Sequence, residues 1–371
     1  MSSRVRLLHE WMRQVEGVLP EVRVTRARGL ALFAAGILWA NSVTLLKVAA
    51  KLPVGASDPS LERRLRRFLA NPQVTVEALW RPLLPALLRG LGQQQVVLVF
   101  DPTPYRDDAT ILVVGVVIRH RLLPLLWRVM PQQTTWPERL EAILAPMLRA
   151  VAAALPPGTT ATLLADRGLI GPGIVDAARA AGLPLVLRLR AGTNEETRVR
   201  LDGGPEQRLA ELPTRPGQRF AGPAAIFKDA GWREGFLTIH WDRGESEPWV
   251  LFSDRPAGPE RVREYRKRAR AEATYQDEKS RGFGLEVSKV AALDRIERLL
   301  LAVHLALWWA YGLGLRVLRT GQRHRFDRRD RRDLSLIRLG QTACTEALDL
   351  GHRPPLPFRS TPLGWTFRWL T

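Results

Sequence analysis

Hydrophobic and polar positions repeat with two different periods along this chain. In residues 1 to about 94, apolar residues recur at helical spacing, as at Leu61, Leu65 and Leu69, and such spacing predicts amphipathic helices. From Gln95 onward, short β-branched runs take over, each bounded by polar residues, and this pattern is typical of strands. We therefore expect a helical N-terminal region followed by a sheet.

The β-patterned runs alternate with helices in a definite order. Strands are predicted at 95–100, 111–118, 122–130, 161–165 and 184–189, with a helix from Pro137 to about Leu155 and a short one opened by Pro172. Sequential hairpins followed by strand–helix alternation favour an α/β fold. The sequence therefore predicts a mixed five-stranded sheet with flanking helices.

The rest of the chain changes character twice. Residues 191–258 hold Gly, Pro, charge and short alternating pieces, which predict a β-rich insertion. The chain is expected to be helical again from about Pro259 through Arg281, then to form an apolar helix over 293–318, a basic run over 319–332 and a last helix near 334–348. This gives five regions: a helical region 1–94, the first part of an α/β core 95–190, an insertion 191–258, the second part of the core 259–320, and a basic C-terminal tail and helix 321–371.

Composition limits the classes of partner. Lys plus Arg number 56 against 37 for Asp plus Glu, with a formal net charge of +19, so a polyanion such as nucleic acid is the expected partner. GC-rich coding also enriches arginine and accounts for part of the excess. It does not account for four arginines on one short predicted helix, Arg63, Arg64, Arg66 and Arg67. Phosphate contact and a solvated charged face both remain open for them.

Two uncharged stretches, 29–46 and 299–315, lie at the short edge of membrane-spanning length. Both carry polar or glycine residues typical of buried core helices, and we expect no membrane partner. The single cysteine, Cys344, excludes an internal disulfide and suits a reducing compartment. No signal peptide is expected, so the predicted location is cytoplasmic.

Four residues form the most specific pattern in the chain. Tyr265, Arg268, Glu272 and Lys279 are separated by three, four and seven positions. At about 100° per residue, they fall within an arc of about 60° on one helix face. A carboxylate on that face can hold a divalent metal, and the cations beside it can hold phosphate.

Two further carboxylates suit the same chemistry. Asp101 and Asp166 each follow a predicted strand, and in open α/β sheets ligands collect at that edge. With Glu272 they give three oxygen ligands, which favour Mg²⁺ or Mn²⁺, and two ions could be held in this way. The six histidines form no pair at ligand spacing, which makes a zinc hydrolase an unlikely class.

These motifs together resemble a bacterial insertion-sequence transposase of the DDE class, in the group with the Tyr-Arg-Glu-Lys signature. Asp101-Pro-Thr103 and Ala165-Asp166-Arg167-Gly168 are similar to the segments around the family's two aspartates, and 265–279 matches the signature. The resemblance implies a ribonuclease-H-like core interrupted by a β-rich insertion.

The resemblance also implies a function. Asp101, Asp166 and Glu272 would be catalytic, and Tyr265, Arg268 and Lys279 would grip phosphates near the transposon end. The implied reaction is metal-dependent cleavage at terminal inverted repeats and strand transfer into target DNA, by a homodimer in a nucleoid-associated complex.

Some alternatives stay open at the level of sequence. Relatives use a tryptophan of the insertion to capture a flipped base during excision through a hairpin, and Trp232, Trp241 and Trp249 are candidates. A metal-dependent nuclease that no longer transposes is one alternative function, and a catalytically idle DNA-binding protein is another. Glu260, Glu264 and Glu278 are expected to be solvated helix charges.

Overall fold

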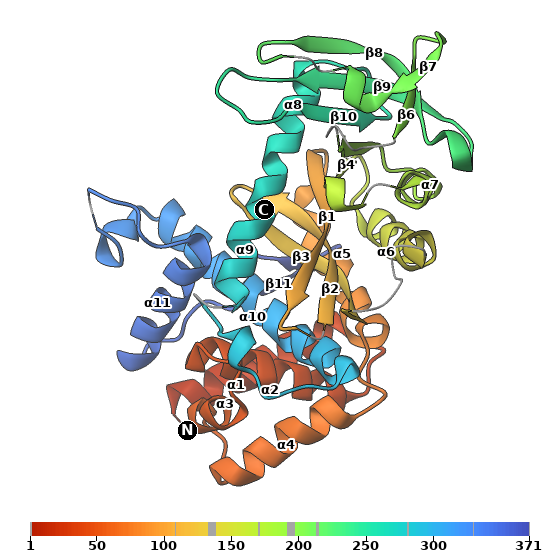
Figure 1. The fold of residues 1–371 in the computed structure, drawn as a ribbon. Coiled ribbons are helices and arrows are strands. Elements are labelled where there is room, and N and C mark those ends of the chain that lie inside the picture. Colours follow the sequence, from red (N-terminus) through yellow and green to blue (C-terminus); the bar gives the residue numbers. More distant parts are fainter. Residues whose placement is uncertain are drawn as a thin grey trace.

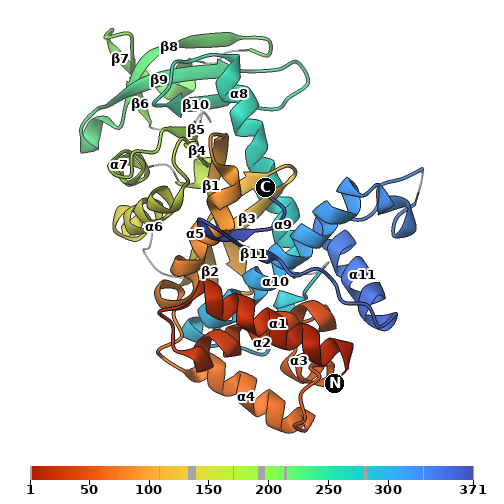
Figure 2. The same cartoon turned by 180° about the vertical axis from the view of Figure 1, so that it is seen from behind.

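The computed structural model describes residues 2–107, 109–132, 139–169, 171–190, 197–212, 215–279, 282–328 and 330–370. A helical region lies at one end of the molecule, a sheet with flanking helices lies in the middle, and a second group of strands lies at the other end (Figures 1 and 2). Helices from the N-terminal part and from the C-terminal part of the chain lie together at the helical end (Figure 1).

The helical region consists of α1 (Ser3–Val18), α2 (Val24–Ala40), α3 (Leu45–Lys51), α4 (Asp58–Ala70) and α5 (Leu84–Leu88). The long apolar helix α10 (Leu293–Arg319) packs against α2. By length and hydropathy α10 could span a membrane, as could α2 and α3 if that pair, bent by 93°, is taken as one span. However, 94% of the apolar window of α10 is buried inside the protein, as expected for the central helix of a core.

The central sheet is built from β1 (Gln95–Tyr105), β2 (Ala109–Ile118), β3 (Arg121–Pro131), β4 (Thr160–Ala165) and β5 (Leu185–Leu189). Their order is β3-β2-β1-β4-β5, with β1 to β3 antiparallel and β4 and β5 parallel to β1. Helices α6 (Leu140–Ala154) and α7 (Pro172–Ala180) pack against each other beside it. This confirms the predicted ribonuclease-H-like fold. Pro137, the predicted first residue of the helix now seen as α6, lies outside the described residues.

The sheet does not stop at five strands, as the sequence led us to expect. Five further strands, β6 (Arg198–Leu201), β7 (Glu206–Arg208), β8 (Arg219–Ile226), β9 (Arg233–His240) and β10 (Trp249–Ser253), extend it to ten. The junction is the antiparallel pairing of β10 with β5. Without it β5 would be an edge strand with unpaired backbone groups, and such edges are normally covered.

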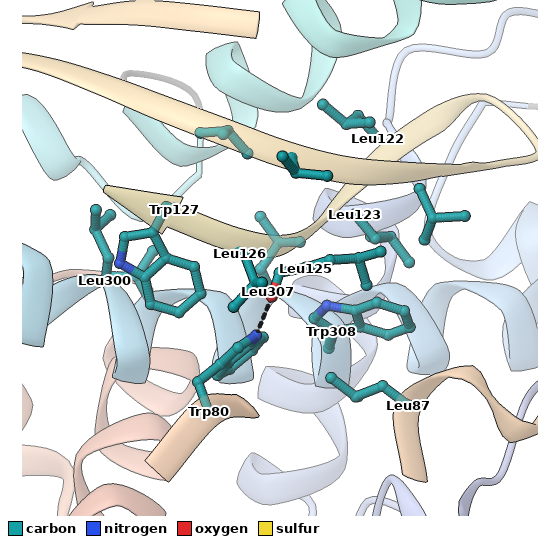
Figure 3. Packing of buried hydrophobic residues seen from close by; sticks show 14 of the residues in the cluster. Trp80, Leu87, Leu122, Leu123, Leu125, Leu126, Trp127, Leu300, Leu307 and Trp308 are labelled. Atoms are coloured by element: carbon teal, nitrogen blue, oxygen red, sulfur yellow. Dashed lines mark hydrogen bonds between the residues drawn. The ribbon is translucent and has the colours of Figure 1, made fainter. Parts of the chain in front are cut away.

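The other edge of the sheet, β3, is covered by side chains. The Trp80 indole N–H donates to the Leu125 carbonyl at 2.6 Å (Figure 3). The Trp308 indole N–H donates to the Pro124 carbonyl at 3.0 Å. Pro124 offers no N–H, which suits an edge strand. These buried tryptophans, with Trp127, join the sheet to α10 and the helical region in one hydrophobic core.

Residues 259–279 are helical as predicted, but they do not form one regular α-helix, and residues 280 and 281 lie outside the described residues. The chain forms α8 (Pro259–Tyr265), a 3-10 turn (Arg266–Ala269) and α9 (Arg270–Lys279), running along the core sheet from the added strands toward the helical region (Figure 1). Thr274 Oγ1 accepts from the Leu122 N–H at 3.0 Å, and Asp277 binds Arg121 at 3.0 Å. Both contacts attach α9 to β3.

The C-terminal part covers the core from the side. Helix α11 (Leu336–Asp349) lies against α10, and the hairpin β11 (Phe358–Thr361) and β12 (Gly364–Phe367) packs on α5. Shorter turns complete the chain at Val76–Trp80, Arg81–Leu83, Arg89–Leu91, Arg167–Leu169, Leu209–Glu211, Lys228–Ala230, Leu285–Val287 and Gln322–Arg325.

Candidate active site

Asp101 lies inside β1 and not at its end. The parallel pairing of β1 with β4 stops at Phe100 and Ala165, while the antiparallel pairing with β2 continues through Asp101 and beyond. The side chain of Asp101 is 7% exposed. The strand is longer than predicted because the hairpin with β2 continues past the point where β4 turns away.

Asp166 directly follows β4, as its sequence position predicted. Since Phe100 and Ala165 are register partners, Asp101 and Asp166 occupy the next positions of two neighbouring parallel strands. Side chains at matching positions of adjacent strands lie on the same face of a sheet. The fold therefore brings the two aspartates together.

Arg268 joins the three predicted catalytic carboxylates. Its guanidinium lies 2.6 Å from Asp101 Oδ1, 3.2 Å from Asp166 Oδ2 and 3.6 Å from Glu272 Oε1. The 3-10 turn carries Arg268 toward the sheet, and its side chain is only 19% exposed. Arg268 is thus the counter-charge of the cluster, where the sequence suggested only a phosphate contact.

The two aspartates have opposite pKa shifts. Burial raises the pKa of Asp101, and Arg268 offsets only part of this effect. For Asp166 burial acts in the same direction, but the hydrogen bond from Tyr265 and the charge of Arg268 outweigh it, and its pKa is lowered. Because Asp166 is the less buried of the two, its hydrogen bond and the nearby positive charge dominate.

Tyr265 takes part in the cluster through its hydroxyl, which donates to Asp166 Oδ1 at 2.8 Å. Burial, followed by the negative charge of Asp166, raises the pKa of Tyr265, so the phenol stays protonated and remains a donor. Tyr265 therefore orients the Asp166 carboxylate in addition to any contact with DNA.

Glu272 and Lys279 are the last two residues of the signature. The Glu272 side chain is 67% exposed, so the third carboxylate lies at the rim of the cluster. The Lys279 side chain lies outside the described residues. The signature residues also do not share one straight helix, because Tyr265 ends α8, Arg268 lies in the 3-10 turn and Glu272 lies in α9.

The donor set fits a divalent cation in its chemistry. Three carboxylates offer the hard oxygen ligands that Mg²⁺ and Mn²⁺ prefer, and two of them already converge on one positive group. Within the described residues, no three His, Cys, Asp or Glu side chains are arranged to hold an ion. In this arrangement the guanidinium of Arg268 supplies the positive charge among them.

The three candidate tryptophans have different surroundings. The Trp249 ring meets the Tyr265 ring edge-on, with the centroids 5.3 Å apart. Trp241 instead donates from Nε1 to the Glu245 carbonyl at 3.0 Å, and Trp232 lies 4.5 Å from the Arg200 guanidinium. Trp249 thus packs directly on a signature residue, Tyr265.

The arginine cluster of α4 lies away from the carboxylates, at the helical end of the molecule (Figure 1). Arg63, Arg64, Arg66 and Arg67 are all exposed, and Arg66 pairs with Glu62 at 2.6 Å. Exposed cations suit both phosphate contact and a solvated face, so this prediction stays open.

Two glutamates were wrongly expected to be solvated. Glu264 is 8% exposed and accepts from Gln95 Nε2 at 3.2 Å, while Glu278 is 4% exposed and lies 3.4 Å from His304 Nε2. Glu260 is exposed as expected and pairs with Arg263. The break between α8 and α9 changes which side of each helix faces the sheet, so a straight-helix projection could not place these residues.

Three charged residues beside the cluster were not singled out from the sequence. Arg167 follows Asp166, Arg188 lies in β5, and Glu247 binds both arginines, at 2.5 and 2.8 Å. Arg167 directly follows Asp166 in the sequence, so its position beside that motif could have marked it as a candidate site residue. Arg188 and Glu247 become neighbours only through the pairing of β5 with β10.

The region that contains most of this cluster is similar to a known family of domains. Residues 132–309, just under half of the chain, match the family model described as transposase DDE domain. This segment is similar to transposase DDE domains. It includes Asp166, Arg268 and Glu272, whereas Asp101 precedes it.

Other comparisons add little. No curated protein matches the chain. Among solved structures, the chain is similar to the piggyBac transposase in its synaptic complex with hairpin DNA, with 12% sequence identity and a TM-score of 0.40 over 94% of this chain and 82% of that one. At this level no residue of one chain is matched to a residue of the other.

Proposed function

We propose that this protein is a DNA transposase that cuts at transposon ends and joins them to target DNA. The observation that carries the proposal is the convergence of Asp101 and Asp166 on Arg268, with Glu272 at the rim. The similarity of residues 132–309 to transposase DDE domains supports it. The net charge of +19 suits a duplex DNA partner, and we propose that two copies act on two ends.

Each residue of the cluster has a proposed role. Asp101, Asp166 and Glu272 would hold Mg²⁺ or Mn²⁺, which would supply an activated water or 3′-hydroxyl and stabilise the leaving oxygen. Tyr265 fixes the orientation of Asp166 and helps to lower its pKa against the effect of burial. Arg268 compensates the charge of the buried Asp101.

The insertion supplies the residue for the finer step that we propose. Trp249 lies beside Tyr265 at the point where the added strands join β5, so a base removed from the end of the duplex could stack on it. Removing a base from the stack costs a few kcal/mol and needs an aromatic or apolar pocket. We therefore propose excision through a hairpin, with Trp249 as the stacking residue in preference to Trp232 and Trp241.

The test is cleavage of the DNA that flanks the protein's own gene. Purified protein with Mg²⁺ should cut at inverted repeats and join the ends to a target plasmid. Replacing Asp101, Asp166 or Glu272 by Ala should abolish both steps and leave DNA binding within about threefold, because phosphate contacts and not these carboxylates supply the affinity. Glu260→Ala, an exposed carboxylate on α8, is the matched control.

Other outcomes would reject the proposal in distinct ways. Cleavage without joining would indicate a nuclease, and binding without Mg²⁺-dependent cleavage would indicate an idle DNA-binding protein. A hairpin would appear on denaturing gels as a product of twice the strand length. Trp249→Ala should reduce this product strongly and Trp232→Ala should not, whereas linear ends alone throughout the reaction would reject the hairpin.

A further inference from the structure

Two arginines lie on the Asp166 side of the cluster. Leu187 of β5 is the register partner of Ala165 in β4, so Arg188 and Asp166 occupy the next positions of two parallel strands. Arg167 is the residue after Asp166 and begins a 3-10 turn. The fold therefore places Arg188 close enough for its charge to act on Asp166, and Arg167 next to Asp166 in the chain.

Both arginines bind the same carboxylate, which comes from the loop between β9 and β10. Glu247 Oε2 lies 2.5 Å from Arg167 Nη1, and Glu247 Oε1 lies 2.6 Å from that atom and 2.8 Å from Arg188 Nη2. Glu247 is separated from Arg167 by 80 residues and from Arg188 by 59. One anionic group thus bridges two cations of the core.

The two sides of this contact differ in how firmly they are held. The Arg188 side chain is 14% exposed, and its guanidinium lies 5.6 Å from the centre of the Trp249 ring. Its Nε is buried and has no hydrogen-bond partner among the described residues. Glu247 is 47% exposed and lies in a loop, and ion pairs this exposed contribute only about 0–1 kcal/mol. Arg188 is therefore built into the sheet, whereas Arg167, 43% exposed in its turn, and the Glu247 carboxylate are held at the surface, and the carboxylate is easily displaced.

We propose that Arg167 and Arg188 form a phosphate-binding site for the DNA strand beside Asp166, and that Glu247 occupies this site in cis until a phosphate displaces it. Carboxylate and phosphate both accept paired hydrogen bonds from guanidinium groups, so one can replace the other at the same donors. The inference rests on the proposed function for the identity of the anion and adds a site and a competitor to it. Glu247 then lowers the affinity for DNA, because a DNA phosphate must first displace Glu247 from Arg167 and Arg188.

The experiment compares Glu247→Gln with Glu245→Gln. Both remove one negative charge from the same exposed loop, but Glu245 contacts neither arginine in the part of the chain that the structure describes. The probes are a short fluorescein-labelled DNA duplex of arbitrary sequence and inorganic phosphate. Affinity for the duplex is measured by anisotropy at fixed salt, and phosphate binding by the shift in melting temperature.

Glu247→Gln should bind the duplex about three- to tenfold more tightly than the wild type, since phosphates dominate affinity for arbitrary DNA. Inorganic phosphate should stabilise this variant more than the wild type. Glu245→Gln should behave like the wild type, and adding Arg188→Gln to Glu247→Gln should cancel both gains.

Two results would overturn the proposal. The first is equal behaviour of Glu247→Gln and Glu245→Gln, and the second is a gain that survives the loss of Arg188. If Glu247→Gln does not fold, Glu247→Asp retracts the carboxylate by one methylene and should give a smaller gain of the same sign; no gain in that variant overturns the proposal. Phosphate binding requires no transposition, so its result is distinct from a failure of the end-cleavage test.

Discussion

Arg268 donates to the carboxylate of Asp101 at 2.6 Å across 167 positions of sequence. Asp101 belongs to the first strand of the sheet and Arg268 to the turn between α8 and α9. This pair joins the two halves of the core that the added strands separate in the sequence. It also neutralises a carboxylate that is almost fully buried, which is costly without a partner.

Replacing Arg268 by Gln should destabilise the protein. Asp101 would keep its buried position but lose its cation, and we expect a loss of about 2–3 kcal/mol in the free energy of unfolding. Calcium, which does not need to support cleavage, should recover more stability in this variant than in the wild type. Urea unfolding with and without Ca²⁺ measures both effects.

The control for that prediction is Arg266→Gln. Arg266 lies in the same turn with a side chain that is 58% exposed, and it pairs with Asp242. Its loss should change stability little, because exposed ion pairs contribute little. Equal losses in the two variants would show that Arg268 is not the specific counter-charge of Asp101.

Replacing Tyr265 by Phe should raise the pKa of Asp166. The hydrogen bond from the Tyr265 hydroxyl is the strongest influence that lowers this pKa, and without it burial acts with less opposition. The carboxylate would then become protonated at a higher pH than in the wild type. Carbon NMR of labelled aspartate measures this directly, and the acid limb of the cleavage rate should move upward in the same direction.

Tyr311→Phe provides the comparison for the Tyr265 variant. It removes the same oxygen from a buried tyrosine on α10, whose hydroxyl donates to the Ile118 carbonyl. The Asp166 titration should not move in this variant. An unchanged titration in Tyr265→Phe would contradict the role assigned to the 2.8 Å contact.

His304 should make stability depend on pH. Burial lowers its pKa to about 3, so in the folded protein it stays neutral, and its contact with Glu278 is not an ion pair at neutral pH. The unfolded chain takes up a proton at His304 below about pH 6.5, and stability present above that pH is lost as the pH falls toward 3. Between pH 6.5 and 5 this site alone should cost about 1.5 kcal/mol.

The His304→Gln variant should lack this dependence. Its free energy of unfolding should fall less than that of the wild type between pH 6.5 and 5, when both are measured by chemical denaturation. His324, which lies at the surface and contacts the Gly321 carbonyl, is the site for the matched variant His324→Gln. Parallel pH profiles for the wild type and His304→Gln would reject the prediction.

Gly340→Ala should loosen the contact between α10 and α11. A methyl group at Gly340 would collide with the backbone carbonyl of Ala310, and backbone atoms cannot yield as a flexible side chain can. Overpacking of this kind costs about 1–3 kcal/mol, which thermal unfolding would detect. Gly55→Ala, where the added methyl group meets open space, should leave the melting temperature nearly unchanged.

Local patterns in the sequence determined much of the core. The alternation of strands and helices predicted β1 to β5 in the right order, and the placement of Asp166 after β4 followed from one apolar run and one polar residue. These features depend on neighbours within about ten positions, and local periodicity reports such neighbours well. The signature spacing likewise identified Tyr265, Arg268 and Glu272 as one group.

Only the tertiary structure decided how those residues are used. The 3-10 turn between α8 and α9 places Arg268 on Asp101, and packing of the two helices against the core buries Glu264 and Glu278. Contacts of α9 with β3 fix its position. The pairing of β10 with β5 unites Glu247 with Arg167 and Arg188. Backbone pairing at a sheet edge is satisfied by any strand of suitable length, so the sequence determined that an insertion exists, and packing determined where it joins.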